Sequence, residues 1–128
     1  MAKVIQPKTL ADPRPRYSQG IQVDGGKLLF IAGQTASDKD GNVVGKGDIE
    51  AQTRQVFKNL SAVLEEAGGR LDNLVMTTTY ITDRKYREGY NRVRMDQYKG
   101  NVPTSTLVIV TGLANPDYLI EINGVAVL

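Results

Sequence analysis

Residues 48–69 read DIEAQTRQVFKNLSAVLEEAGG, and this stretch predicts an amphipathic helix. One face of it repeats at spacings of three and four, through Ile49, Thr53, Val56, Phe57, Leu60, Val63, Leu64 and Ala67. Asp48 is a good N-cap for the first turn, and Gly68 and Gly69 are typical of a helix end. Because the helix has one apolar face, it needs another layer of secondary structure to cover that face.

Two strand-like segments precede this helix, at residues 17–23 and 27–32. They flank Asp24-Gly25-Gly26, which is a turn signal because glycine adopts positive φ without strain. The sequence therefore predicts a β-hairpin there. Residues 1–16 carry three of the five prolines, and we expect them to form an extended N-terminal arm along the body of the protein.

Three more strands and a second helix follow. Residues 74–82 read LVMTTTYIT and are dense in β-branched side chains, which favour strands. Asp83 can cap a helix that we predict over residues 84–98. Further strands are predicted over residues 105–110 and 119–127, so the order of elements is β-β-α-β-α-β-β.

This order predicts a single α+β domain over residues 1–128, with a mixed β-sheet and two helices on one face in a two-layer sandwich. The strands carry Val, Ile and Leu at positions that face both ways, so the second face of the sheet is apolar as well. An exposed apolar face of that size usually marks an interface. We therefore expect a homo-oligomer.

Composition excludes several classes of protein. Apolar residues make up 41% and charged residues 23% of the 128 positions, as in an average soluble globular protein. The 16 Lys and Arg against 14 Asp and Glu give a formal charge of +2, and they are scattered, so no nucleic-acid partner is predicted. No signal peptide and no run of roughly 18 apolar residues is present, so we expect a cytoplasmic protein without a membrane segment.

The chain has no Cys and no His, which removes whole kinds of chemistry. Thiolate nucleophiles and thiolate metal sites are excluded, together with the commonest general base and the commonest metal ligand. An acid or base in an active site must be a carboxylate, a Lys, a Tyr or an ordered water.

Glu121 is the candidate catalytic residue. It is the one ionisable residue among the aliphatic side chains of residues 119–127. Period-two alternation puts Glu121 and Asn123 on one face of this strand, and Ile120 and Ile122 on the other. A carboxylate in apolar surroundings suits a general base, because desolvation disfavours its charged form. The alternative is that Glu121 points to solvent near a sheet edge.

Three hydroxyl residues, Thr104, Ser105 and Thr106, stand between a proline and an aliphatic run in NVPTSTLVIV, residues 101–110. No His or Cys is available to activate them, so a serine-hydrolase nucleophile is not expected. They are either an ordinary polar start to a strand or hydrogen-bonding groups for a ligand. Gly33 at the end of an earlier strand has the same two interpretations, namely packing or close approach of a ligand.

The second helix carries a group of basic residues. They are most simply a solvated helix face: Arg84, Lys85, Arg87, Arg92 and Arg94. The apolar face of the same helix is expected to hold Tyr86, Tyr90 and Val93.

Short motifs along the chain occur in an order typical of one known family. They are YSQGI at 17–21, FIAGQ at 30–34, AQTRQVFKNLSAVLEEAGG at 51–69, TTTYITD at 77–83, Asn91, and IEINGVAV at 120–127. From residue 17 to the C-terminus the chain resembles the RidA/YjgF family. The resemblance implies a chorismate-mutase-like fold and a homotrimer whose sheets form a central barrel, with three ligand clefts between subunits. It also implies hydrolysis of reactive imines and enamines, such as 2-iminobutanoate, to 2-keto acids and ammonia without a cofactor.

The resemblance assigns roles to several residues. Glu121 matches the glutamate that orders the attacking water. Tyr17, Gly33 and Asn91 match positions that hold or line the ligand cleft. Asn123 departs from the pattern, because many relatives carry a second Glu there.

A larger departure concerns the arginine that binds the substrate carboxylate in that family. Where the typical family sequence is P-A-R-S, this chain reads Pro103-Thr-Ser-Thr106, so Ser105 stands at the arginine position. Arginine binds a carboxylate through two parallel hydrogen bonds, and a serine hydroxyl does not replace that fork. By the resemblance, Thr104, Ser105 and Thr106 form a neutral floor for the cleft.

Three interpretations of this departure are open. The substrate is an imine, enamine or amide-like compound that lacks the carboxylate, or the cleft of a regulatory trimer binds a small molecule without catalysis. In the third, Arg14 or Arg16 reaches in from the arm to supply the charge. A protein-interaction role would leave no sequence signature.

Overall fold

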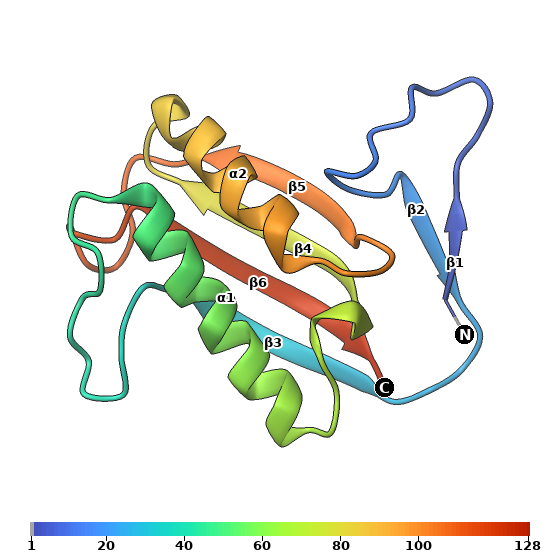
Figure 1. The fold of residues 1–128 in the computed structure, drawn as a ribbon, viewed down its shortest axis with the longest axis horizontal. Coiled ribbons are helices and arrows are strands. Elements are labelled where there is room, and N and C mark those ends of the chain that lie inside the picture. The colour runs from blue at the N-terminus through green and yellow to red at the C-terminus, as the bar shows by residue number, and fades with distance from the viewer. Residues whose placement is uncertain (1) are drawn as a thin grey trace.

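The computed structural model describes residues 2–128 and contains a four-stranded mixed sheet (Figure 1). Its strands, in spatial order, are β3 (Leu28–Gln34), β6 (Ile120–Val127), β4 (Leu74–Ile81) and β5 (Thr104–Ile109). The β3–β6 and β6–β4 pairs are antiparallel, and β4–β5 is parallel. The parallel pair follows from the long crossover between β4 and β5, which contains a helix.

Both long helices, α1 (Ile49–Glu66) and α2 (Arg87–Gln97), lie on the same face of the sheet (Figure 1). Two 3-10 turns, η1 (Leu71–Asn73) and η2 (Arg84–Tyr86), lead into β4 and α2. The Asp48 side chain accepts a hydrogen bond from the backbone N–H of Ala51 at 3.1 Å, as an N-cap does. The α+β sandwich with helices on one face is thereby confirmed. Within residues 2–128, no helix has the length and apolar character needed to span a membrane.

The core lies between the helices and one face of the sheet. It is built from alternate residues of β6, and from a helix stripe that includes Val56, Phe57, Leu60 and Leu64. The opposite face of the sheet is open. Phe30 is 73% exposed and Leu28 62% exposed on β3, as expected for an apolar face without a second layer in one chain.

The N-terminal part of the chain differs from the predicted hairpin. A separate two-stranded sheet joins β1 (Ala2–Ile5) to β2 (Gly20–Val23), whereas β3 pairs with β6. The prediction of a β-hairpin between residues 17–23 and 27–32 was therefore wrong. The turn itself exists, with Gly25 and Gly26 at φ of 77° and 102°. A turn signal specifies a local change of direction, but not whether the two flanking strands pair with each other.

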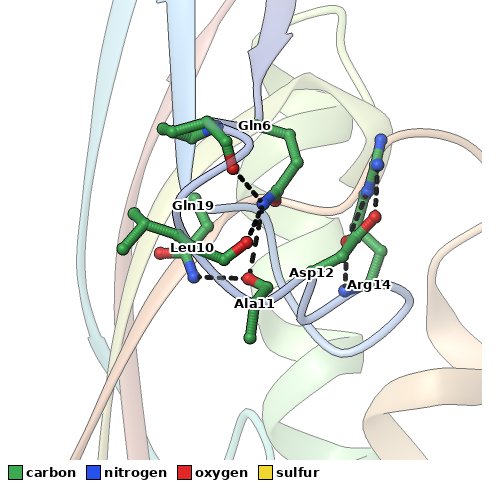
Figure 2. Close-up of polar contacts among 7 residues, drawn as sticks. Gln6, Leu10, Ala11, Asp12, Arg14 and Gln19 are labelled. Carbon is green, nitrogen blue, oxygen red and sulfur yellow. Dashed lines mark hydrogen bonds and ion pairs between the residues drawn. The ribbon is translucent and has the colours of Figure 1, made fainter.

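The segment between β1 and β2 is a folded loop over most of its length (Figure 2). The Gln6 side-chain amide donates hydrogen bonds to the carbonyls of Pro7 and Leu10 at 3.1 and 3.0 Å, and Gln19 donates to Ala11 at 3.0 Å. An extended arm was expected over residues 1–16, of which residue 1 lies outside the described residues; within residues 2–16, only β1 is an extended strand. The loop is fixed to the start of β5 by Ser18, whose Oγ donates to the Val102 carbonyl at 2.6 Å.

Candidate functional site

The residues predicted for the site lie on two opposite faces of the sheet. Strand alternation sends Ser105 toward the helices, where it contacts α2, whereas Glu121 points to the open face. Tyr17 and Asn91 join Ser105 on the helix side. Gly33 and Thr106 lie on the open face, as Glu121 does. One chain therefore does not bring all of the predicted residues together.

On the open face, Glu121 lies over Gly33. It is half-buried between the buried Ile120 and Ile122, which confirms the predicted alternation. A Cβ atom built on Gly33 would overlap the Glu121 carboxylate, so the absence of a side chain at Gly33 makes room for that group. The close approach expected of Gly33 is thus made by a side chain of the same protein.

The register between β3 and β6 shifts at the same place, between Ile31 and Gln34. A bulge of this kind bends a strand and frees backbone groups from the ladder. Beside it lies an open cavity of about 320 Å³, lined in part by Gly33, Thr78 and Asn123. A carboxylate, a bulged backbone and a cavity therefore adjoin one another on the open face.

On the helix side, a pocket of about 270 Å³ opens between α2, β5 and the end of the N-terminal loop. Its walls are Arg16, Tyr17, Arg87, Tyr90, Asn91, Arg94, Ser105 and Leu107. Three of these side chains are guanidinium groups and none is a carboxylate. A larger cavity of about 530 Å³, between β1–β2 and the C-terminus, contains none of the predicted site residues. Chemistry, rather than size, identifies the smaller pocket as the one of interest.

Arg94 is the functional candidate that sequence reasoning missed. It is only 6% exposed, so its place in a solvated helix face was wrong. Its Nη1 donates to the Tyr90 hydroxyl at 2.9 Å and to Ser105 Oγ at 3.3 Å, and its guanidinium lies 4.8 Å from the Tyr90 ring centroid. Residues 90 and 94 are four apart and share a helix face. That spacing to a core tyrosine was the available signal.

The three hydroxyl residues of β5 do not share one face of the sheet within one chain. Thr104 Oγ1 donates to the Val75 carbonyl at 3.0 Å, and its own carbonyl accepts from Thr77 Oγ1 at 3.1 Å. Thr106 is exposed on the open face, opposite Thr78 in the ladder. Ser105 alone lines the helix-side pocket. The ordinary structural interpretation thus accounts for Thr104.

The two arginines of the arm differ in their surroundings. Arg14 is paired with Asp12, with Nε 2.8 Å from Oδ1 and Nη2 2.5 Å from Oδ2 (Figure 2). Hydrogen bonds from the Arg14 side chain and backbone lower the pKa of Asp12 to about 2. Arg16 instead lines the helix-side pocket. Of the two, only Arg16 stands near Ser105.

Acidic side chains are not gathered into a metal site. Within residues 2–128, no cluster of three or more Asp or Glu side chains could hold a metal ion, and the sequence has no Cys or His. The available groups are therefore one carboxylate on the open face, and guanidinium, hydroxyl and amide groups on the helix side. Such groups can order water and bind anions.

Comparison with known proteins identifies the family. The model of the family described as endoribonuclease L-PSP matches residues 8–128. The chain belongs to the RidA/YjgF family. A RutC family protein of Pyrococcus horikoshii is 39% identical over 98% of both chains. The Rid-family protein YyfB of Yersinia pestis is 34% identical, with a TM-score of 0.92 over 99% of this chain and 98% of its own.

A second Rid-family structure, YyfA of Yersinia pestis, is 36% identical over the whole of both chains, with a TM-score of 0.74. The two Yersinia proteins are nearly equally similar in sequence to this Rid-family chain, yet their backbones match it to different degrees. Backbone arrangement therefore varies within the family at similar sequence identity. The resemblance inferred from the motifs is confirmed at the level of family and fold.

Proposed function

We propose that this chain is a cofactor-independent hydrolytic deaminase of a small reactive imine or enamine, with Glu121 ordering the attacking water. The observation that carries the proposal is the Glu121 carboxylate, half-buried over Gly33 and beside an open cavity, in a member of the RidA/YjgF family. A chain without His or Cys has few other groups able to take a proton from water at neutral pH.

The proposed reaction adds water across a C=N bond. Glu121 accepts a proton from the water while the water oxygen bonds to the imine carbon. Glu121 then passes that proton to the imine nitrogen. The tetrahedral carbinolamine then breaks its C–N bond while its hydroxyl proton moves to the departing nitrogen, which leaves a carbonyl compound and ammonia and consumes one water for each imine. The backbone around Gly33, released from the ladder by the bulge, is available to hold a polar group of the substrate.

A complete cleft in this proposal needs a second copy of the chain. Glu121 and the pocket around Ser105 lie on opposite faces of one sheet, so one subunit would supply the carboxylate and its neighbour the pocket. The exposed Leu28, Phe30 and Met76 on the open face support a homotrimer with these faces turned inward. The ligand would then be a small molecule held between subunits.

A non-catalytic metabolite-binding trimer is the second candidate, because Ser105 stands where the family pattern has an arginine. The deaminase would convert its ligand to a product, whereas the binding trimer would release its ligand chemically unchanged. The family description, endoribonuclease, suggests RNA cleavage as a third candidate, which is tested separately by incubating RNA with the protein and measuring its cleavage.

The deciding experiment measures ammonia and keto-acid release from 2-iminobutanoate, generated in place by an amino-acid oxidase. We expect turnover by the wild type and a loss of about a hundredfold or more in Glu121→Gln, since general base catalysis typically contributes about 10²–10⁴-fold. Glu65→Gln, at an exposed site on α1, is the matched control. Full turnover by Glu121→Gln would falsify the mechanism, and ligand-induced thermal stabilisation without turnover would favour the binding protein.

A further inference from the structure

We propose that Arg94, reaching from α2 to Ser105, forms the carboxylate-binding subsite of this protein together with Arg16 and Arg87. The inference deepens the proposed function, because it names the ligand class of the same cleft as small molecules that carry a carboxylate. The arginine absent from β5 is thereby replaced by one from a different element.

The first argument is that Arg94 is a buried charge without a counter-ion. The ion pairs within residues 2–128 join other side chains, and none includes Arg94. Arginine stays protonated in proteins, so its charge persists even at 6% exposure. A buried, unpaired charge is costly unless an opposite charge accompanies it. An anionic ligand supplies that opposite charge.

The second argument concerns the free donors of the guanidinium. The hydrogen bonds that Arg94 makes to residues 2–128 both leave from Nη1. Its Nε is buried and has no partner among these residues. Nε and Nη2 together form the edge of the fork that binds a carboxylate through two parallel hydrogen bonds. A planar oxyanion that reaches this edge would supply the partner that Nε lacks among residues 2–128.

The third argument is that Arg94 is held rigidly in position. The Tyr90 hydroxyl accepts from Arg94 and lies 3.0 Å from Thr79 Oγ1, which is fully buried on β4. Ser105 Oγ, at the position of the missing arginine, is the other acceptor. A fork whose orientation is fixed before binding loses little conformational entropy when a ligand arrives. Ser105 therefore acts as a support for the arginine.

The surroundings of the pocket favour anions as well. Arg16 and Arg87 are exposed and line its mouth, and no acidic side chain lines it. Like charges around a small opening raise the local concentration of anions, in a way that salt screens. The neighbouring Arg92 is different, because it turns away and pairs with Glu50 at 3.2 Å.

The test measures binding of 2-oxobutanoate and of its neutral amide to the full-length protein by isothermal titration. We expect the wild type to prefer the carboxylate, and Arg94→Gln to weaken its binding by about tenfold or more, as loss of a charge-assisted pair does. Arg94→Lys keeps the charge without the fork and should bind with intermediate affinity. Arg92→Gln is the matched control on the same helix and should bind as the wild type does.

Two further variants separate this inference from the proposed activity. Glu121→Gln should lose turnover but keep its affinity for 2-oxobutanoate. The double variant Arg94→Gln/Ser105→Arg returns an arginine to the strand and should recover carboxylate binding. Should Arg94→Gln fail to fold by circular dichroism, Arg94→Lys and Arg87→Gln provide the test.

Unchanged affinity in the folded Arg94 variants, or equal binding of the amide by the wild type, would overturn the subsite.

Discussion

Replacing Gly33 with alanine should separate the stability of this protein from its activity. A Cβ atom at this position would lie 2.8 Å from Glu121 Cδ and 3.0 Å from its Cγ, both closer than ordinary contact distances. All of the crowded atoms belong to one long, half-buried side chain and none to the backbone. Rotation of the Glu121 side chain away from Gly33 can therefore relieve the overlap without moving either strand.

The expected change in the free energy of unfolding is small. Forcing a side chain about 30° from its rotamer costs about 0.5–1.5 kcal/mol. Replacing Gly by Ala, where the backbone permits it, stabilises by about 0.4–1 kcal/mol through the unfolded chain. Gly33 is not among the positive-φ glycines, so alanine fits its backbone. These opposing contributions leave a net change of about 1 kcal/mol or less, measurable by urea denaturation.

Turnover should fall much further, because the displaced carboxylate no longer orders the attacking water. We expect a loss of about tenfold to a hundredfold in the imine assay, since positional errors of about 1 Å cost up to about 10²-fold. In the background of Glu121→Gln, the same substitution should cost little more, because both changes act through one carboxylate. Full activity of Gly33→Ala would refute the role given to this contact, and destabilisation above about 3 kcal/mol would show that the backbone moved.

Other parts of the molecule give predictions of their own. Asp12 should titrate near a pKa of 2 by NMR, below its ordinary value of 3.8, and Arg14→Gln should raise that pKa. Because the folded-state pKa is lowered, the stabilisation from this pair is present above about pH 4 and is lost as the pH falls toward 2. Phe30→Asp, on the open face, should convert the proposed trimer to monomers in light scattering while leaving the helical circular dichroism unchanged; a stable trimer would locate the interface elsewhere. Leu60→Ala, in the fully buried stripe of α1, should lower the free energy of unfolding by about 2–5 kcal/mol, and a loss below 1 kcal/mol would contradict its place in the core.

The elements that sequence predicted correctly were those specified by local signals that agree with one another. In α1 the apolar repeat, the Asp48 cap and the terminal glycines agree with one another, and the helix covers Ile49–Glu66 as expected. In β6 strict alternation fixed both the burial of Ile120 and Ile122 and the direction of Glu121. These signals are local, so tertiary structure could confirm them but was not needed to find them.

The errors arose where a position depends on distant partners. The glycines after β2 predict a turn, but the partners of β2 and β3 lie at residues 2–5 and 120–127. Arg94 was expected to be exposed to solvent because it is charged. Its helical spacing of four residues from Tyr90, which would have indicated a buried position, was given less weight. The division of Glu121 and Ser105 between two faces depends on strand order, which one sequence does not supply.

Strand β3 lies at the edge of the sheet and pairs only with β6 within residues 2–128, which affects how newly made chains behave. Within residues 2–128, the outer side of β3 has no ladder partner, and its sequence LLFIAGQ contains no charge and no proline. A bare, apolar edge of this kind can template the addition of strands from other chains. Until the proposed assembly covers this edge, each chain carries an aggregation hazard, countered by the bulge between Ile31 and Gln34 and by the charge of Lys27 beside the strand.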